Sequence, residues 1–208
     1  MKFDLRPLDR TYLEPAFKLA TRVFIEASTL HRALAVGLNE YQDYLRPSFE
    51  KMVDEGLSFA ATDAESGRLM GCLIVSDFCN QIAASFPDNP KFAPMSVLTA
   101  ELTDQYTQKR SISVGEAILV DMGAVSVDAR GQGIYQLMRA AVHDAARNQG
   151  FKWVVGELSS SATQHVVLNA LGHSKMAEVF FDSFEFEGDY PFRAIEAPPS
   201  IILAEGEL

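Results

Sequence analysis

Alternating apolar and polar residues mark the strands expected in the first part of this chain. Residues 2–8 alternate from Phe3 onward and predict a short first strand. Residues 57–62 and 69–78 are two further strand-like runs, separated by the turn sequence Ala64-Glu65-Ser66-Gly67. Two such runs on either side of a glycine-containing turn are typical of a β-hairpin.

Apolar residues at three- and four-residue steps predict helices between these strands. Asp9 is the expected cap of the first helix, and Asn39 is the expected cap of a second that continues to Glu55. The stretch between them, residues 24–37, has no clean period and is expected to be a loop with a short turn. Prolines 87, 90 and 94 break the chain after the hairpin, and helical spacing then resumes in an extra helix over about 91–109. The pattern leaves open whether this helix is a lid over a site or plain packing.

The last third of the chain predicts a buried strand, a capped helix and further strands. Residues 153–158 are mostly apolar, and Ser159-Ser160-Ser161 then offers a cap for a helix over 162–171. Alternation predicts a strand over 177–186 that continues at 192–195. An apolar run predicts the C-terminal strand at about 200–205.

The centre of the chain combines a strand, a glycine-containing turn and a long amphipathic helix. The strand, 118–127, is interrupted at Gly123, which suggests a bulge or a close backbone approach. Helical spacing over 134–146 ends at Gly150. Between strand and helix lies Arg130-Gly131-Gln132-Gly133-Ile134. Glycines in such a turn let backbone N–H groups face one concavity at a helix N-terminus, which suits a pyrophosphate.

The spacing of the motif limits which class of phosphate-containing ligand this turn could bind. It lacks the Lys-Ser/Thr ending of a nucleoside triphosphate loop and the three-glycine spacing of a dinucleotide fingerprint. It resembles the acyl-CoA loop of the GNAT acetyltransferases, Arg/Gln-x-x-Gly-x-Gly/Ala, with Arg130 and Gly133 in the first and fourth positions. Tyr135 stands in the sixth position, where that family has a small residue, and Val127 stands where many members have proline. An ordinary glycine-bearing turn is the alternative, but strand, loop and long helix together favour acyl-CoA.

The resemblance implies an α/β (α+β) GNAT fold for a single domain over residues 1–208. That fold has a mixed central sheet of about six to seven strands, flanked by helices, with a splayed central strand. Within the superfamily the chain is most similar to the arylalkylamine (dopamine-type) N-acetyltransferases. The similarity rests on the extra helix and on the segments 30–37, 54–60, 157–161 and 192–203.

The same resemblance implies where acetyl-CoA would bind as cosubstrate. In GNAT folds, backbone groups beside the splayed strand pair with the pantetheine arm, and the glycine loop holds the pyrophosphate. The residues implied for cofactor binding are Gly123, Ala124, Val125, Arg130, Gly131, Gln132, Gly133, Ile134, Tyr135 and Ser161.

Acetyl transfer to an amine needs an acceptor for the amine proton and a proton for the departing thiolate. Asp121 is the leading candidate base because it interrupts an apolar strand, although a structurally paired aspartate fits the same pattern. Glu26 is the second candidate, since the dopamine-type enzymes have an acidic residue near this point. The usual GNAT tyrosine acid is replaced by Leu168, so Ser160 is the candidate partner of the thiolate. Helix capping is the alternative role for Ser160.

Composition and charge limit the partners. The chain has 208 residues, and none of its apolar runs approaches the roughly 18 residues of a membrane span. The two cysteines lack the spacing of a metal site or a disulfide framework, so we expect a cytoplasmic protein without a metal. A net charge of −10 without a basic cluster argues against nucleic acid and suits a cationic amine. The sequence leaves open whether the chain forms a homodimer.

Together these features predict an acetyl-CoA-dependent N-acetyltransferase that acts on the primary amine of a small acceptor. An arylalkylamine is the favoured acceptor class, and Phe24, Tyr41, Phe78 and Phe92 are the candidate pocket walls. Two alternatives remain: the same fold acting on a polyamine, antibiotic or protein amine, and a non-catalytic acyl-CoA-binding module.

Overall fold

A single mixed sheet organises the part of the chain that the computed structural model describes, residues 2–82 and 89–208. Its seven strands lie in the order β1-β2-β3-β4-β5-β7-β6. Neighbouring strands are antiparallel except for β4 and β5, which are parallel. The strands are β1 (Phe3–Pro7), β2 (Phe59–Asp63), β3 (Leu69–Asp77), β4 (Ala117–Val125), β5 (Trp153–Leu158), β6 (Ser174–Phe180) and β7 (Ser200–Glu207).

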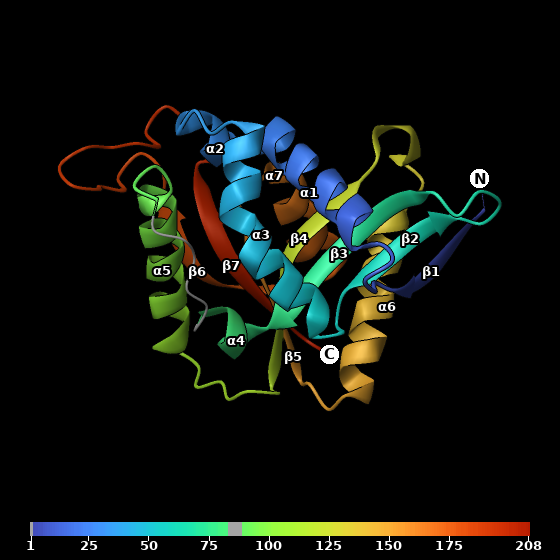
Figure 1. The fold of residues 1–208 in the computed structure, drawn as a ribbon. Coiled ribbons are helices and arrows are strands. Elements are labelled where there is room, and N and C mark those ends of the chain that lie inside the picture. The colour runs from blue at the N-terminus through green and yellow to red at the C-terminus, as the bar shows by residue number, and fades with distance from the viewer. Residues whose placement is uncertain (1, 83–88) are drawn as a thin grey trace.

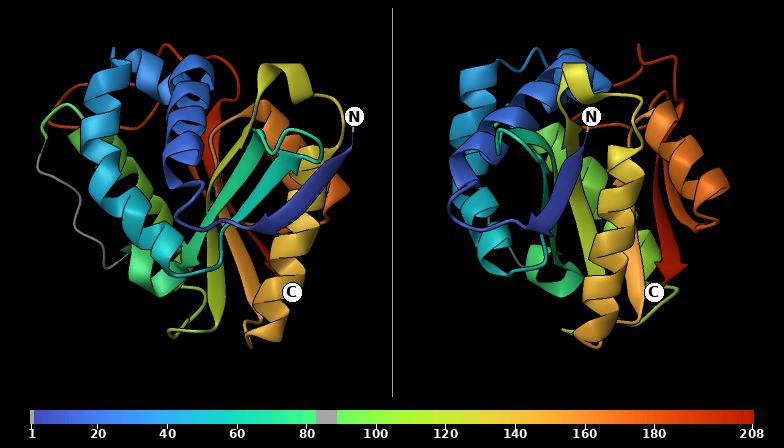
Figure 2. Two further views of the ribbon diagram at one scale, coloured as in Figure 1. Left: turned by 45° about the vertical axis from the view of Figure 1, so that its right-hand side comes forward. Right: turned by 90° about the vertical axis from the view of Figure 1, so that its right-hand side faces the viewer.

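Helices cover both faces of this sheet (Figure 1). They are α1 (Leu13–Ala27), α2 (Thr29–Ala33), α3 (Leu38–Asp54), α4 (Phe78–Ile82), α5 (Ala93–Thr107), α6 (Ile134–Asn148) and α7 (Ser161–Gln164), with short helical segments η1 (Val127–Ala129) and η2 (His165–Ala170). Figure 2 shows α6 and α7 on one side of the sheet and α1 and α3 on the other. Helix α5 packs against β6 and β7.

The periodicity of α6 explains why it forms and which face it buries. Ile134, Met138, Val142 and Ala146 recur at four-residue steps and are all almost fully buried. They pack against β2, β3 and β4. Each large apolar side chain buried in this way stabilises the fold by about 1.5–3 kcal/mol. This packing fixes the N-terminus of α6 beside the end of β4.

Several predicted elements are confirmed. The hairpin is present as the antiparallel pair β2 and β3, and the first strand pairs with β2. The extra helix predicted at about 91–109 is α5, and the strand predicted at about 200–205 is β7. The mixed sheet of the predicted GNAT fold is also present, at seven strands among the described residues.

The two predicted N-terminal caps were wrong. Helix α1 begins at Leu13, and the Asp9 carboxylate instead accepts a hydrogen bond from the Thr11 backbone N–H at 2.8 Å. Asp9 therefore stabilises a turn that precedes the helix. Helix α3 begins earlier than Asn39, with Gly37 at its N-cap. The stretch 24–37 contains the last turn of α1 and all of α2, so it is more helical than its irregular pattern predicted.

The strand predictions near the C-terminus were too long. Strand β6 ends at Phe180, and residues 191–194 form a turn. The buried ring of Phe192 packs against Phe181 and Phe184, with ring centroids 6.2 and 5.6 Å apart. Apolar residues here anchor a loop to the core, which mimics strand alternation in the sequence. The break predicted at Pro87 lies outside the described residues.

Candidate functional site

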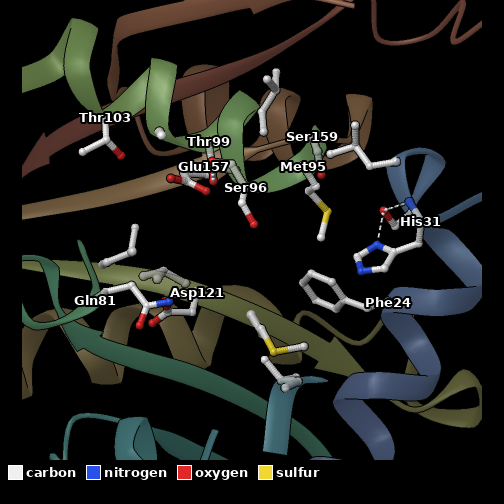
Figure 3. A pocket seen from close by; sticks show the side chains of 18 of the residues that line it. Phe24, His31, Gln81, Met95, Ser96, Thr99, Thr103, Asp121, Glu157 and Ser159 are labelled. Carbon is white, nitrogen blue, oxygen red and sulfur yellow. Dashed lines mark hydrogen bonds between the residues drawn. The ribbon is translucent and has the colours of Figure 1, made fainter. Parts of the chain in front are cut away.

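A cavity of about 610 Å³ opens on the face of the sheet that carries α1, α3 and α5. Its walls come from these helices and from α2, and its floor comes from β4, β5 and β7. Helix α5 contributes Met95, Ser96 and Thr103 to the wall, so the extra helix is part of the cavity as well as packing. Figure 3 shows Asp121 and Glu157 entering this space from neighbouring strands.

A bulge in β4 directs Asp121 into the cavity. Ile74 of β3 pairs with Met122, but the next residue, Val75, pairs with Val120. Asp121 is therefore an extra residue between two pairs, and such bulges re-aim side chains. Asp121 and Met122 both line the cavity as a result. The predicted bulge is real but lies two residues before Gly123, which pairs regularly with Leu73.

Strands β4 and β5 diverge at the same level. Their pairing covers only Ala117–Leu119 against Trp153–Val155. Beyond this point β5 continues to pair with β7 on its other side, up to Leu158. The facing edges of β4 and β5 thus separate where Asp121 and Glu157 occur. This is the splayed central strand that the resemblance to the GNAT fold implied.

The two carboxyl groups are poor acids compared with exposed ones. Burial raises the pKa of Glu157 to about 7. Burial also raises the pKa of Asp121 well above its usual value, and the negative charge of Glu157 adds to this effect. The Ser76 hydroxyl donates a 2.8 Å hydrogen bond to Asp121 and lowers this pKa in part. Two carboxyl groups with raised pKa values therefore line the same cavity.

The remaining wall is acidic, neutral polar or apolar. Asp104 of α5 is a third acidic residue of the lining, and lysine and arginine do not contribute to it among the described residues. Burial lowers the pKa of His31 to about 4, so this side chain is neutral at physiological pH. A cavity with carboxylates and without cationic side chains favours a cationic ligand.

Aromatic rings from α1 and α3 also line the cavity. Phe24 and Tyr41 line it, as predicted, and the His31 ring lies 4.4 Å from that of Tyr41. The other two predicted wall residues belong to the core instead. Phe78 packs edge-on against Tyr106, and Phe92 stacks on the ring of Tyr44, which itself lines the cavity.

The glycine loop has the geometry of an anion site. Gly131 and Gly133 adopt positive φ angles of 76° and 73°, which favour glycine. Among the described residues, backbone carbonyls do not accept the N–H groups of residues 131–133. These groups precede α6, a helix of 15 residues, and the exposed Arg130 lies beside them. Loop, helix N-terminus and arginine together fit a pyrophosphate.

Tyr135 contacts the one place where β4 lacks a side chain. A Cβ atom built on Gly123 would lie only 2.5 Å from Cε2 of the Tyr135 ring. The close approach predicted at Gly123 is therefore made by this ring. The residue that departs from the small sixth position of the loop motif packs beside the diverging edge of β4.

The other predicted site residues lie apart from the cavity. Glu26 is exposed in the last turn of α1 and does not contribute to the lining. Ser160 is the N-cap of α7, where its Oγ accepts the Thr163 N–H at 3.2 Å. Ser161 is exposed. The sequence reasoning missed Glu157 as a site residue, although it interrupts an apolar strand just as Asp121 does.

Residues 2–82 and 89–208 also bear on metal binding and on membrane insertion. Histidine, cysteine, aspartate and glutamate side chains do not gather there in any group of three or more that could hold a metal. Within the same residues, every helix is too short or too polar to cross a membrane.

Comparison with known proteins shows the fold. Protein-family models and curated proteins give no match to this sequence. The C-terminal condensation domain of Ebony, in complex with beta-alanyl-dopamine, is similar in structure at TM-score 0.88 and 16% identity, over 100% of both chains. A mosquito arylalkylamine N-acetyltransferase (like 5b) is similar at TM-score 0.81 and 18% identity, also over 100% of both chains. A Drosophila melanogaster polyamine N-acetyltransferase follows at TM-score 0.70 and 16% identity, again over 100% of both. The chain therefore has the GNAT fold.

Proposed function

We propose that this protein transfers an acetyl group from acetyl-CoA to the primary amine of a small cationic acceptor. One observation carries the proposal: Asp121 and Glu157 line a cavity at the point where β4 and β5 diverge, and its described lining contains neither lysine nor arginine. The structural likeness to N-acetyltransferases supports this function, since those proteins share the fold.

The chain's own groups fit the cosubstrate. Beyond Leu119 the edge of β4 has no strand partner on the β5 side, so its backbone groups can pair with an extended arm. The N–H groups of residues 131–133 and the Arg130 guanidinium suit a pyrophosphate. When bound, acetyl-CoA would supply the activated thioester. The glycine loop and the edge of β4 would hold it.

The two carboxylates are the proposed proton acceptors. A protonated amine in the cavity would pair with Glu157 or Asp121, and one of them would take its proton before the N–C bond forms. Glu157 suits this task because its pKa of about 7 lies near the working pH. The C–S bond breaks as the N–C bond forms, and the thiolate then takes a proton from solvent or from a nearby hydroxyl.

The acceptor class is proposed from the cavity walls. The rings of Phe24, Tyr41 and Tyr44 favour an amine with an aromatic arm. Asp104 on α5 lines the same cavity and instead favours a second positive charge, as in a polyamine. The similar structures include an arylalkylamine and a polyamine N-acetyltransferase, so both classes of amine belong in the test.

The test is turnover with a panel of arylalkylamines and polyamines, with free CoA detected by a thiol reagent. Glu157→Gln and Asp121→Asn should each lower turnover, by about 10²–10⁴-fold for the residue that accepts the proton. Acetyl-CoA affinity should stay nearly constant, because both side chains lie on the acceptor side. Glu116→Gln is the matched control: Glu116 immediately precedes β4, pairs with Lys152 and lies outside the cavity. Acetyl-CoA binding without turnover for any amine would favour the non-catalytic alternative.

A further inference from the structure

Helix α6 buries a second stripe of residues beside its apolar face, and this stripe is polar. It consists of Tyr135, Arg139 and His143, which are spaced four residues apart and therefore share one side of the helix. Arg139 is only 1% exposed. Its guanidinium donates a hydrogen bond to the Tyr135 side chain. Its Nε and Nη2 atoms are buried and have no hydrogen-bond partner in the part of the chain that the structure describes.

A histidine from another element completes the cluster. His173 follows η2 and lies over Gly206 of β7, where a Cβ atom would be only 2.5 Å from its ring. The rings of His143 and His173 are 6.0 Å apart and nearly parallel, at 24°. Both interact electrostatically with Arg139. His143 Nε2 and His173 Nδ1 are also buried atoms without a hydrogen-bond partner among residues 2–82 and 89–208.

The cluster has donors and a positive charge but no acid to balance them. Among the described residues, Arg139 forms no salt bridge, and the nearby Asp144 is exposed and paired with Arg147. Burial is the main cause that lowers the pKa of both imidazoles to about 4, so at neutral pH each can donate one N–H and carries no charge. An unpaired buried guanidinium destabilises a fold unless an anion or several hydrogen bonds compensate.

We propose that Arg139, His143 and His173 bind a small monovalent anion, of the size of chloride, between α6 and the end of η2. The unpartnered nitrogen atoms of these three side chains would donate to it, and Arg139 would supply the balancing charge. The site is separate from the glycine loop, because it lies on the side of α6 rather than at its N-terminus. The Arg139 guanidinium is almost fully buried, so a small anion should reach it more readily than a bulky one.

The experiment is thermal unfolding in sodium chloride and in sodium gluconate at one ionic strength. The wild-type midpoint should be higher in chloride, by about 5–10 °C at chloride concentrations near a hundred times the Kd. Arg139→Met should melt at the same temperature in both salts, and in gluconate it should be at least as stable as the wild type. Arg147→Met is the matched control, because Arg147 lies on the same helix but is exposed, and it should keep the chloride response.

Two additional variants make the assignment specific. Arg130→Glu alters the other candidate anion site and should keep the full chloride response. His173→Phe keeps a ring over Gly206 but removes the donor, so it should weaken the response, and it tests the site if Arg139→Met fails to fold. Chloride-35 line broadening by the wild type should be reduced in the same variant. Equal wild-type midpoints in the two salts, or a response lost in Arg130→Glu and kept in Arg139→Met, would overturn the proposal.

Discussion

Replacing Glu157 with glutamine should stabilise the protein at alkaline pH and change its stability little in mild acid. Burial raises the pKa of Glu157 from 4.5 to about 7. Between these values the folded protein keeps a proton that the unfolded chain has released, so its stability falls as the pH rises. A difference of about 2.5 in pKa corresponds to about 3 kcal/mol at pH values above 7. This is an upper value, because the half-buried side chain is partly screened by solvent.

The charge of Glu157 also raises the pKa of Asp121, so its removal acts in the same direction. Urea unfolding of both proteins from about pH 5 to about pH 8 measures the effect. Glu116→Gln is the control with the opposite sign. Hydrogen bonds from Ser113 and Lys152 lower the pKa of Glu116, so this carboxylate stabilises the fold at neutral pH and the benefit is lost in acid. A wild type that gains stability over Glu157→Gln as the pH rises would refute the reasoning.

Three other outcomes are expected. Arg130→Glu should weaken acetyl-CoA binding about tenfold or more in calorimetry, because it reverses a charge beside the proposed pyrophosphate site; an unchanged affinity would remove this loop from the proposal. Gly123→Ala should lower the free energy of unfolding by about 1–3 kcal/mol, because the new Cβ meets the Tyr135 ring at 2.5 Å. The same substitution should cost less in a Tyr135→Ala background, and an equal cost in both backgrounds would contradict this contact. Ser160→Ala should cost about 1 kcal/mol through the lost cap of α7, whereas Ser161→Ala should be neutral; a loss of turnover by Ser160→Ala at full stability would instead return the hydroxyl to the site.

Local chemistry explains which elements were predictable from the sequence. Helix α6 and the β2–β3 hairpin combine regular spacing with clear turn residues, and both are confirmed. The strand prediction at 192–195 was wrong because Phe192 is buried against Phe181 and Phe184 in a loop. A buried residue in a loop gives the same apolar pattern in the sequence as a residue in a strand. The predictions of Asp9 and Asn39 as caps were wrong because several residue types near the start of a helix can accept hydrogen bonds from its first backbone N–H groups. Tertiary packing decides which one does.

The candidate site shows a second limit on what can be predicted from the sequence. Asp121 stood out in the sequence because a carboxylate interrupts an apolar strand, and Glu157 carries the same signal in β5. The pattern of each strand says nothing about its neighbour, so it cannot reveal that β4 and β5 part at Leu119 and Val155. It also cannot place a bulge, which depends on the register against β3. The pair of carboxyl groups is therefore a property of strand pairing, which a single sequence does not encode locally.

Tyr135 illustrates how a departure from a motif can be compensated elsewhere. In the sequence it stands as a bulky residue in a position that the resembled family keeps small. In the structure its ring fills the space over Gly123, the one residue of β4 without a side chain, so the strand accommodates the ring at that level. Four residues later on the same side of the helix, Arg139 interacts with the Tyr135 side chain and carries the buried positive charge. Tyr135 thus joins the diverging edge of β4 to the polar stripe of α6, and a residue that weakens the motif locally becomes part of the packing that positions the loop.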